Sequence, residues 1–335
     1  MSTDVISSGA GKVGRYFTVV SALPAAVFVS YVYLLLRAGA PAKPMDWSRV
    51  AQFHPEQLAV VVLITLVLAL AINPMQFPLI QLFEGYWGTS ALAVELALIR
   101  TAHHRRRRQA LLQRHQAASP ADENVIYQRM QNDAPLSNLR AGIIADEAQR
   151  QLTGYPGPEL GRELPTRLGN VLRRYEDAIA RPYGLDPLVS VPRLAMVANE
   201  REVDYVQNQR VQLELALRTA FFALLATPLT VGLMCRNGMW LLLAAAPYAV
   251  AFFAYRGAVA LAHEYGVSLS VLTDLSRFTL YERLRLPEPV NTLDERDNNR
   301  AVMALFRMND NTSVTYRSVP SPTDSPPQQP GPNAD

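Results

Sequence analysis

The most basic stretch of the chain consists of four consecutive arginines, Arg105, Arg106, Arg107 and Arg108. Guanidinium groups bind phosphate through paired hydrogen bonds, and basic residues just inside a membrane span attract anionic headgroups by about 1 kcal/mol each. No aromatic residue is interleaved with the four arginines, so the stretch lacks the stacking groups that single-stranded nucleic acid needs. We therefore expect these arginines either to contact anionic lipid or simply to set the topology, and we expect no nucleic-acid partner.

Residues that could bind a metal ion are few and poorly spaced. His103 and His104 are adjacent, so on a helix their side chains point about 100° apart and cannot chelate one ion. His263 is followed by Glu264, but no second histidine lies four residues away, and Cys235 is the single cysteine. The sequence therefore predicts no metal site and no disulfide.

Motifs for catalysis are also weak. Residues 9–14, with the sequence GAGKVG, match the glycine pattern of a dinucleotide-binding loop, but no buried strand precedes them and an apolar stretch follows. Glu176 and Asp177 are adjacent carboxylates, which are more typical of a solvated helix edge than of a catalytic pair. The serines and threonines lack the glycines of a nucleophile elbow. We expect no cofactor and no enzymatic activity.

The elements that must position these groups are dominated by apolar segments. Of the 335 residues, 49% are hydrophobic and only 18% are charged. Four stretches are apolar and long enough to cross a hydrocarbon core of roughly 30 Å as helices: about residues 16–36, 58–83, 219–235 and 239–255. The alternative is that some are core helices of a soluble protein, but those normally keep a polar face, which these stretches lack.

The first stretch has a second interpretation as a cleaved signal peptide. Ala38-Gly39-Ala40 fits the small-residue pattern of a cleavage site, and Lys12 and Arg15 form a basic front end. Its apolar region is longer than that of a signal peptide, however, and Pro41 would follow the cut. We favour an uncleaved anchor.

The distribution of positive charge predicts the orientation. Of the 32 lysines and arginines, 28 fall before span one, between spans two and three, or after span four, and 4 fall in the two other loops. Positively charged loops resist translocation across the membrane. We therefore expect both termini and the segment between spans two and three to be cytoplasmic.

The predicted fold class is an all-α integral membrane protein, with four transmembrane helices in two pairs and a helical cytoplasmic insertion between spans two and three. Its predicted regions are an N-terminal transmembrane pair (1–88), a cytoplasmic helical region (89–218), a transmembrane hairpin with a stalk helix (219–286) and a polar C-terminal tail (287–335). Three residues, 236–238, separate spans three and four, which requires an antiparallel hairpin. Six prolines among the last 18 residues predict disorder from about residue 318.

Span two is interrupted at Asn73 and Pro74, and again at Pro78. Polar residues then alternate with aromatic and aliphatic ones up to Trp87, a pattern typical of a helix that bends and lies along the membrane surface. The alternative is a broken helix that lines a cavity, as in transporters. We expect the bend, and we keep the broken helix as the basis of the second functional hypothesis.

Two cytoplasmic segments have the apolar periodicity of amphipathic helices. Leucine, valine, tyrosine and isoleucine recur at spacings of three and four in residues 165–180, and a similar pattern runs through residues 200–218 into span three. Gly169 would allow a close helix approach, Gly184 would close the first helix, and Pro192 with Arg193 would begin a new element. The first apolar stripe needs another helix or the membrane surface to cover it. The second helix would extend span three into the cytoplasm as a stalk and could pack on the region between spans two and three.

Residues 164–172 (LPTRLGNVL), 183–186 (YGLD) and 192–194 (PRL) are similar to a segment of uncharacterised multi-pass membrane proteins of actinobacteria. The resemblance covers about 30 residues directly. The 30 arginines against 2 lysines fit a GC-rich bacterial genome. The resemblance implies the four-span topology and no activity, because that group has no assigned reaction.

These observations predict a non-enzymatic, membrane-anchored scaffold or signalling component of the bacterial cytoplasmic membrane, whose cytoplasmic helices bind a protein partner or a second copy. The alternative is a pore or transporter subunit that uses the Asn73-Pro74 break. Spans one, three and four contain no Asp, Glu, Lys, Arg or His, which disfavours proton-coupled transport.

Overall fold

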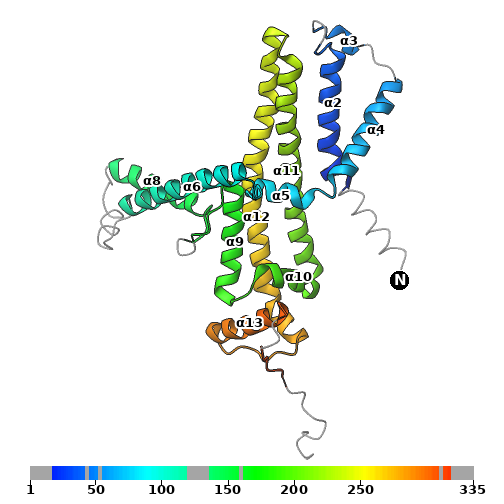
Figure 1. Cartoon of the computed structure of the whole chain (residues 1–335). Coiled ribbons are helices and arrows are strands. Elements are labelled where there is room, and N and C mark those ends of the chain that lie inside the picture. The colour runs from blue at the N-terminus through cyan, green and yellow to red at the C-terminus, as the bar shows by residue number, and fades with distance from the viewer. Residues whose placement is uncertain are drawn as a thin grey trace, which may run out of the picture. The chain divides into compact units, whose positions relative to one another are not determined.

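The computed structural model describes residues 17–41, 45–51, 55–118, 136–157, 161–308 and 312–317 (Figure 1). Within these residues every regular element is helical, which confirms the predicted all-α class. The chain forms two compact units, one of residues 1–178 and 201–270 and the other of residues 179–200 and 271–335. The GAGKVG motif at residues 9–14 and the tail from residue 318 lie outside the described residues.

The first unit contains the apolar helices. Its elements are η1 (Phe17–Ala22), α2 (Leu23–Arg37), α3 (Ser48–Ala51), α4 (Pro55–Ile72), α5 (Gln76–Glu84), α6 (Ala91–Ala118), α8 (Leu136–Leu152), most of α9 (Arg167–Tyr183), nearly all of α11 (Glu200–Met234), η3 (Gly238–Ala244) and the first two thirds of α12 (Ala245–Arg283). Among the described residues, three helices are long and apolar enough to cross a membrane: Val20–Arg37, Glu200–Met234 and Gly238–Arg283. Helices α4 and α5 together make a fourth if the bent pair is one span.

The bend between α4 and α5 has a local chemical cause. Pro74 has no backbone N–H to continue a helix, and it disfavours helical geometry at Asn73 before it. The two helices differ in direction by 68°. Pro78 lies in the first turn of α5, where its missing N–H costs nothing. Gly85 ends α5 with φ +106°, a left-handed conformation that favours glycine.

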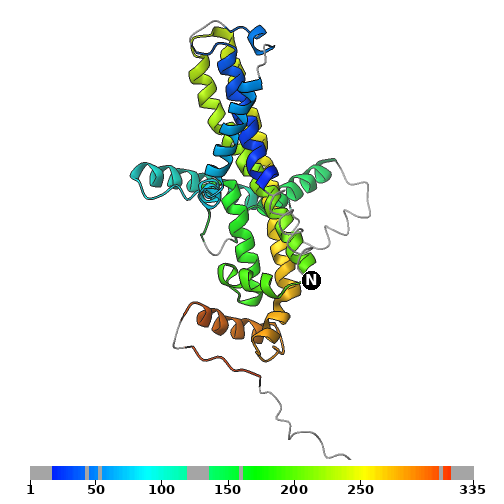
Figure 2. The ribbon, with the colours of Figure 1, turned by 90° about the vertical axis from the view of Figure 1, so that its right-hand side faces the viewer.

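The apolar helices pack through small and aromatic residues. Ala25 of α2, Ala69 and Ile72 of α4, Leu79 of α5 and Phe222 of α11 form one buried cluster. The Tyr31 hydroxyl of α2 lies 2.9 Å from the Thr230 hydroxyl of α11, so these polar groups satisfy each other inside an apolar region. Helices α11 and α12 lie side by side in both views (Figures 1 and 2).

The apolar stripe of α9 faces the long helices. Leu168 and Val171 of α9 pack with Leu213 and Leu217 of α11, and Ala258 and Ala262 of α12 complete this cluster, which we call the anchor cluster. The stripe predicted in residues 165–180 is therefore covered within the chain itself. It does not offer a surface to a protein partner.

Gly169 of α9 has the predicted function of allowing close approach. A Cβ atom at this position would overlap the Glu84 carbonyl oxygen at the end of α5 and would lie 2.9 Å from Leu164 Cδ1. The Thr166 hydroxyl donates a hydrogen bond to the same carbonyl at 2.8 Å. The N-terminus of α9 is thus held directly against the end of α5.

Helices α6 and α8 pair with each other, and α8 was not predicted from the sequence. Leu111 of α6 packs with Ala148 and Leu152 of α8 and with Tyr155 beyond it. The apolar face of α8 is narrow, so its periodicity is a weak signal. Helix α6 carries the four consecutive arginines and extends to residue 118.

The second unit is built from α10 (Pro187–Val197), α13 (Thr292–Phe306) and the last turns of α9 and α12. Its buried cluster joins Leu185, Tyr281, Leu286, Val302 and Met303. Helix α13 lies in the region that was predicted to be a polar tail. The apolar periodicity of this segment is short, so it gives a weak helix signal. The helix is stabilised by the Asn291 side chain, which accepts hydrogen bonds from two backbone N–H groups, and by burial against other segments.

Two of the predicted element boundaries in this unit have clear outcomes. Gly184 has φ +69° immediately after α9, which confirms its predicted role in ending that helix. The prediction that Pro192 begins an element is wrong, because Pro192 lies inside α10. Helix α10 begins earlier because the Asp186 side chain accepts a hydrogen bond from the Leu188 N–H, and Pro187 suits a first helical position.

Candidate functional site

The basic stretch of α6 is partly neutralised by a carboxylate. Arg108 lies 2.6 Å from one oxygen of Glu163, and Arg105 lies 3.3 Å from the other. The side chains of Arg108 and Glu163 are only 8% and 5% exposed, so this ion pair is buried. Arg108 can therefore reach a lipid headgroup only by leaving Glu163.

The two remaining arginines differ in environment. The Arg107 guanidinium donates a hydrogen bond of 3.2 Å to the Gln151 side-chain oxygen on α8. Arg106 is exposed. The predicted contact with anionic lipid therefore stays a prediction, and Arg106 together with the half-exposed Arg105 is best placed for it.

Burial alone would raise the pKa of Glu163. A backbone hydrogen bond and the Arg108 guanidinium outweigh that effect, and the pKa of Glu163 is lowered. The carboxylate thus stays charged at neutral pH. It ties the residues that precede α9 to the middle of α6.

His104 is buried next to this ion pair. It is 2% exposed, and its Nδ1 atom lies 3.1 Å from the Tyr155 hydroxyl. Burial, reinforced by the positive charges of Arg100, His103 and Arg107, lowers the pKa of His104 to about 4. The imidazole is therefore neutral at physiological pH.

This pKa predicts a pH-dependent stability. The unfolded chain binds a proton at His104 near pH 6.5, whereas the folded chain does so only near pH 4. The free energy of unfolding should therefore fall between these values as the pH is lowered, by up to roughly 3 kcal/mol from this group. Unfolding measured against pH for wild type and His104→Gln should show that the variant loses this part of the slope. The exposed neighbour variant, His103→Gln, is the control, and equal slopes in wild type and His104→Gln would contradict the prediction.

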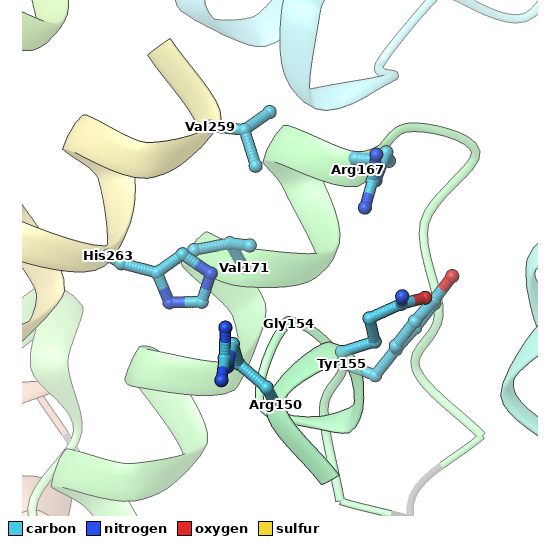
Figure 3. Close-up of a pocket in the computed structure, with 8 residues that line it drawn as sticks. Arg150, Gly154, Tyr155, Arg167, Val171, Val259 and His263 are labelled. Atoms are coloured by element: carbon cyan, nitrogen blue, oxygen red, sulfur yellow. The ribbon is translucent and has the colours of Figure 1, made fainter. Parts of the chain in front are cut away.

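A cavity of about 200 Å³ lies beside this buried network (Figure 3). It is bounded by the end of α8 and the loop after it, by the first turns of α9, and by α12. Its lining residues are Arg150, Gln151, Gly154, Tyr155, Arg167, Val171, Val259 and His263. Figure 3 shows Arg150, Arg167 and His263 around the same space, with Val171 and Val259 forming an apolar wall.

This cavity was not predicted from the sequence, in which His263 appears as an isolated histidine. Arg150, Arg167 and His263 are far apart in the chain, so no local motif joins them. The weak signal that was present is the glycine and proline at residues 154–157, which follow the end of α8 where Tyr155 turns back towards α6.

The residues of the span-two break lie at the bend described above. Asn73 and Pro74 fall between α4 and α5, and Pro78 lies within α5. Just after the bend, the Gln76 side-chain amide donates a hydrogen bond to the Glu214 carboxylate of α11. Glu214 is buried and also pairs with Arg210 at 2.8 Å.

A second buried charge lies one turn further along α11. Arg218 is 2% exposed, and its guanidinium donates a hydrogen bond to the Ser21 hydroxyl of η1. Span three was predicted to begin at residue 219, after an amphipathic helix over residues 200–218. The structure instead buries Glu214 and Arg218, because η1 and α5 cover this part of α11.

The other candidate groups have structural roles. Glu176 and Asp177 both pair with Arg162, and Asp177 lies 2.6 Å from that guanidinium. The prediction of a solvated helix edge is wrong for Asp177, which is buried, because the loop before α9 folds over it. Among the described residues, no group of three or more His, Cys, Asp or Glu side chains could hold a metal ion.

No protein-family model, curated protein or solved structure matches the chain. The resemblance to multi-pass membrane proteins of actinobacteria therefore stays a prediction.

Proposed function

We propose that the protein is a non-enzymatic, membrane-anchored scaffold or signalling component of a bacterial cytoplasmic membrane. In this proposal α2, the α4–α5 pair, α11 and η3–α12 anchor the chain, and α6, α8, α9, α10 and α13 lie on the cytoplasmic side. Of these, α6, α8, α10 and α13 present surfaces to a protein partner or to a second copy of the chain.

The observation that carries the proposal is the continuity between the apolar helices and the polar ones. Helices α11 and α12 run for 35 and 39 residues without interruption, from apolar segments into polar segments. The anchor cluster packs α9 against both of them outside the apolar segments. A membrane hairpin would thus hold α9 rigidly, as an anchored scaffold requires.

The surface of α5 and α6 supports a boundary position for these helices. Leu92, Leu96, Leu98 and Ile99 of α6 are all exposed, and the basic stretch follows them. Exposed leucines on several sides of a helix are costly in water but not at the edge of a bilayer. In Figure 1, α5 and α6 run across the direction of α2 and α11. This arrangement favours a helix that bends and lies along the membrane surface.

The packing of α5 favours the scaffold over a pore. Leu79 belongs to the buried cluster of α2, α4 and α11, while Ile80 and Phe83 pack against the anchor cluster. The segment after the break is therefore occupied in helix packing, which differs from the role of a broken helix that binds a transported ion. The count of 28 against 4 positive residues supports the cytoplasmic orientation.

Site-specific photo-crosslinking in native membranes tests the proposal. A photo-reactive residue at Ile143 of α8 or at Leu188 of α10, both exposed apolar positions outside the bilayer in this proposal, should give discrete protein adducts. The matched control is Leu63 of α4, which is similarly exposed. In this proposal Leu63 faces the lipid, so it should give lipid adducts. If both test positions gave only the uncrosslinked monomer, the scaffold proposal would be contradicted. A specific ion flux in proteoliposomes that Asn73→Leu abolishes would contradict it as well.

A further inference from the structure

The cavity between α8, α9 and α12 has no part in the anchoring role proposed above. Its volume of about 200 Å³ is below the roughly 300–1,000 Å³ of pockets for drug-sized ligands, so its ligand must be small. Arg150 approaches from the end of α8, Arg167 from the first residue of α9 and His263 from α12 (Figure 3). Polar groups that converge from three helices on one small space are typical of a binding site.

We infer that this cavity binds a small ligand with a phosphate group, held between Arg150 and Arg167. Each guanidinium keeps its charge at any physiological pH and offers up to five N–H donors in a planar fork that matches phosphate oxygens. Val171 and Val259 would contact an apolar part of the ligand. The inference is independent of the scaffold role, because it requires only this pocket.

Both arginines retain the capacity to bind an anion. Arg167 has no ion-pair partner within the described ranges. Arg150 lies 3.7 Å from Glu147, and both of these side chains are largely exposed, so the interaction is weak. Arg108, in contrast, is fully engaged by Glu163. The cavity is therefore lined by the arginines that are available and not by those that hold the fold together.

His263 is positioned to supply a third hydrogen-bonding group. Its Nδ1 atom lies 3.5 Å from the Tyr175 hydroxyl, and within the described part of the chain its Nε2 atom has no hydrogen-bond partner. A Cβ atom at Gly154 would lie 3.9 Å from that Nε2. Because Gly154 has no side chain, the space in front of Nε2 stays open to a ligand oxygen.

The surroundings of the cavity are electropositive. Arg107 is hydrogen-bonded to Gln151 of the lining, which also donates to Glu147 and is thereby held in place. Burial raises the pKa of Tyr155, which lines the cavity, and the positive charges of Arg107 and Arg167 oppose that rise. A field of this sign favours an anion over a neutral or cationic ligand.

The phosphate could belong to a soluble metabolite or to a lipid headgroup, and the chemistry at the arginines is the same. The start of α9 lies against the end of α5, through the Thr166 hydrogen bond to Glu84. Since α5 is the segment expected along the membrane surface, a headgroup could approach as well as a free phosphate. The experiment must therefore separate the two sources.

The test uses the full-length protein in phosphatidylcholine nanodiscs and calorimetric titration with inorganic phosphate and with glycerol 3-phosphate. Saturable binding of either ligand is expected, weakened at least tenfold by Arg150→Gln or Arg167→Gln. The control is Arg140→Gln, which removes the same charge from α8 about 15 Å away and should leave binding unchanged. All three side chains are exposed, so unchanged melting temperatures should show that the variants fold.

A second arm uses nanodiscs in which phosphatidic acid replaces part of the phosphatidylcholine. If the ligand is a headgroup, native mass spectrometry should show phosphatidic acid retained by wild type and Arg140→Gln but lost from the two cavity variants. If it is soluble, retention should be equal and the calorimetric difference alone should appear. Equal behaviour of wild type, Arg150→Gln and Arg167→Gln in both arms would overturn the inference, whatever the outcome of the crosslinking experiment.

Discussion

Replacing Glu163 with glutamine is expected to lower the free energy of unfolding by about 3–5 kcal/mol. The substitution preserves shape but leaves the buried Arg108 without its counter-charge, and an uncompensated buried charge carries a cost of this size. Thermal unfolding of the purified protein in detergent, followed by circular dichroism, measures the effect. Arg106→Gln removes an exposed charge from the same helix and should change stability by less than about 0.5 kcal/mol.

A double variant distinguishes the ion pair from a general loss of packing. Replacing both partners, as Arg108→Met with Glu163→Leu, removes both buried charges together and should recover much of the stability that Glu163→Gln loses. The lowered pKa of Glu163 also has a consequence for acid stability. The contribution of the pair should be complete at neutral pH and should disappear as the pH falls through the folded pKa, which is lower than the ordinary value of a glutamate. Unchanged stability of Glu163→Gln at neutral pH would show that the pair does not hold α6 in place.

Gly169→Ala is expected to have the second largest effect, a loss of about 3 kcal/mol. The added methyl group would overlap the Glu84 carbonyl, and a backbone atom cannot rotate away as a side chain could. Helix α9 would have to move away from α5, which would disturb the anchor cluster and the first turn that carries Arg167. A lower melting temperature and faster proteolysis before α9 are the expected observations.

The matched control for this variant is Gly142→Ala in α8. Gly142 also lies inside a helix, but a Cβ atom there would meet nothing within 4 Å. Since alanine is the better helix former, this change should stabilise the protein by about 0.5–1 kcal/mol. Equal effects of the two alanine substitutions would mean that the contact between α9 and Glu84 does not constrain the fold.

The candidate site could be predicted only in part. The basic stretch of α6 was visible from the sequence, but four consecutive positions on a helix point in four directions. Their environments depend on elements 44 or more residues further along the chain. Those elements decide which arginine is buried, which is bound to Gln151 and which stays exposed. Arg150 and Arg167 carried no signal at all, because single arginines at unremarkable spacings are usually solvated.

Elements with weak periodicity were missed for a related reason. Helix α8 was not predicted because its apolar face is narrow, and α13 was not predicted because its stability comes from the Asn291 cap and from the burial of Val302 and Met303 by other segments. Local propensity is a weak prior for such helices, and tertiary contacts decide whether they form.

The sequence alone determined the all-α class, the apolar helices, the bend at Asn73-Pro74 and the close approach at Gly169. Each of these follows from a local property: uninterrupted apolar composition, a missing backbone N–H or a missing side chain. The tertiary structure alone decided that Arg108 pairs with Glu163, that Glu214 and Arg218 are buried, and that Arg150, Arg167 and His263 surround one cavity. These features depend on which distant segments meet, and electrostatic pairing between distant residues leaves no periodic pattern along a chain.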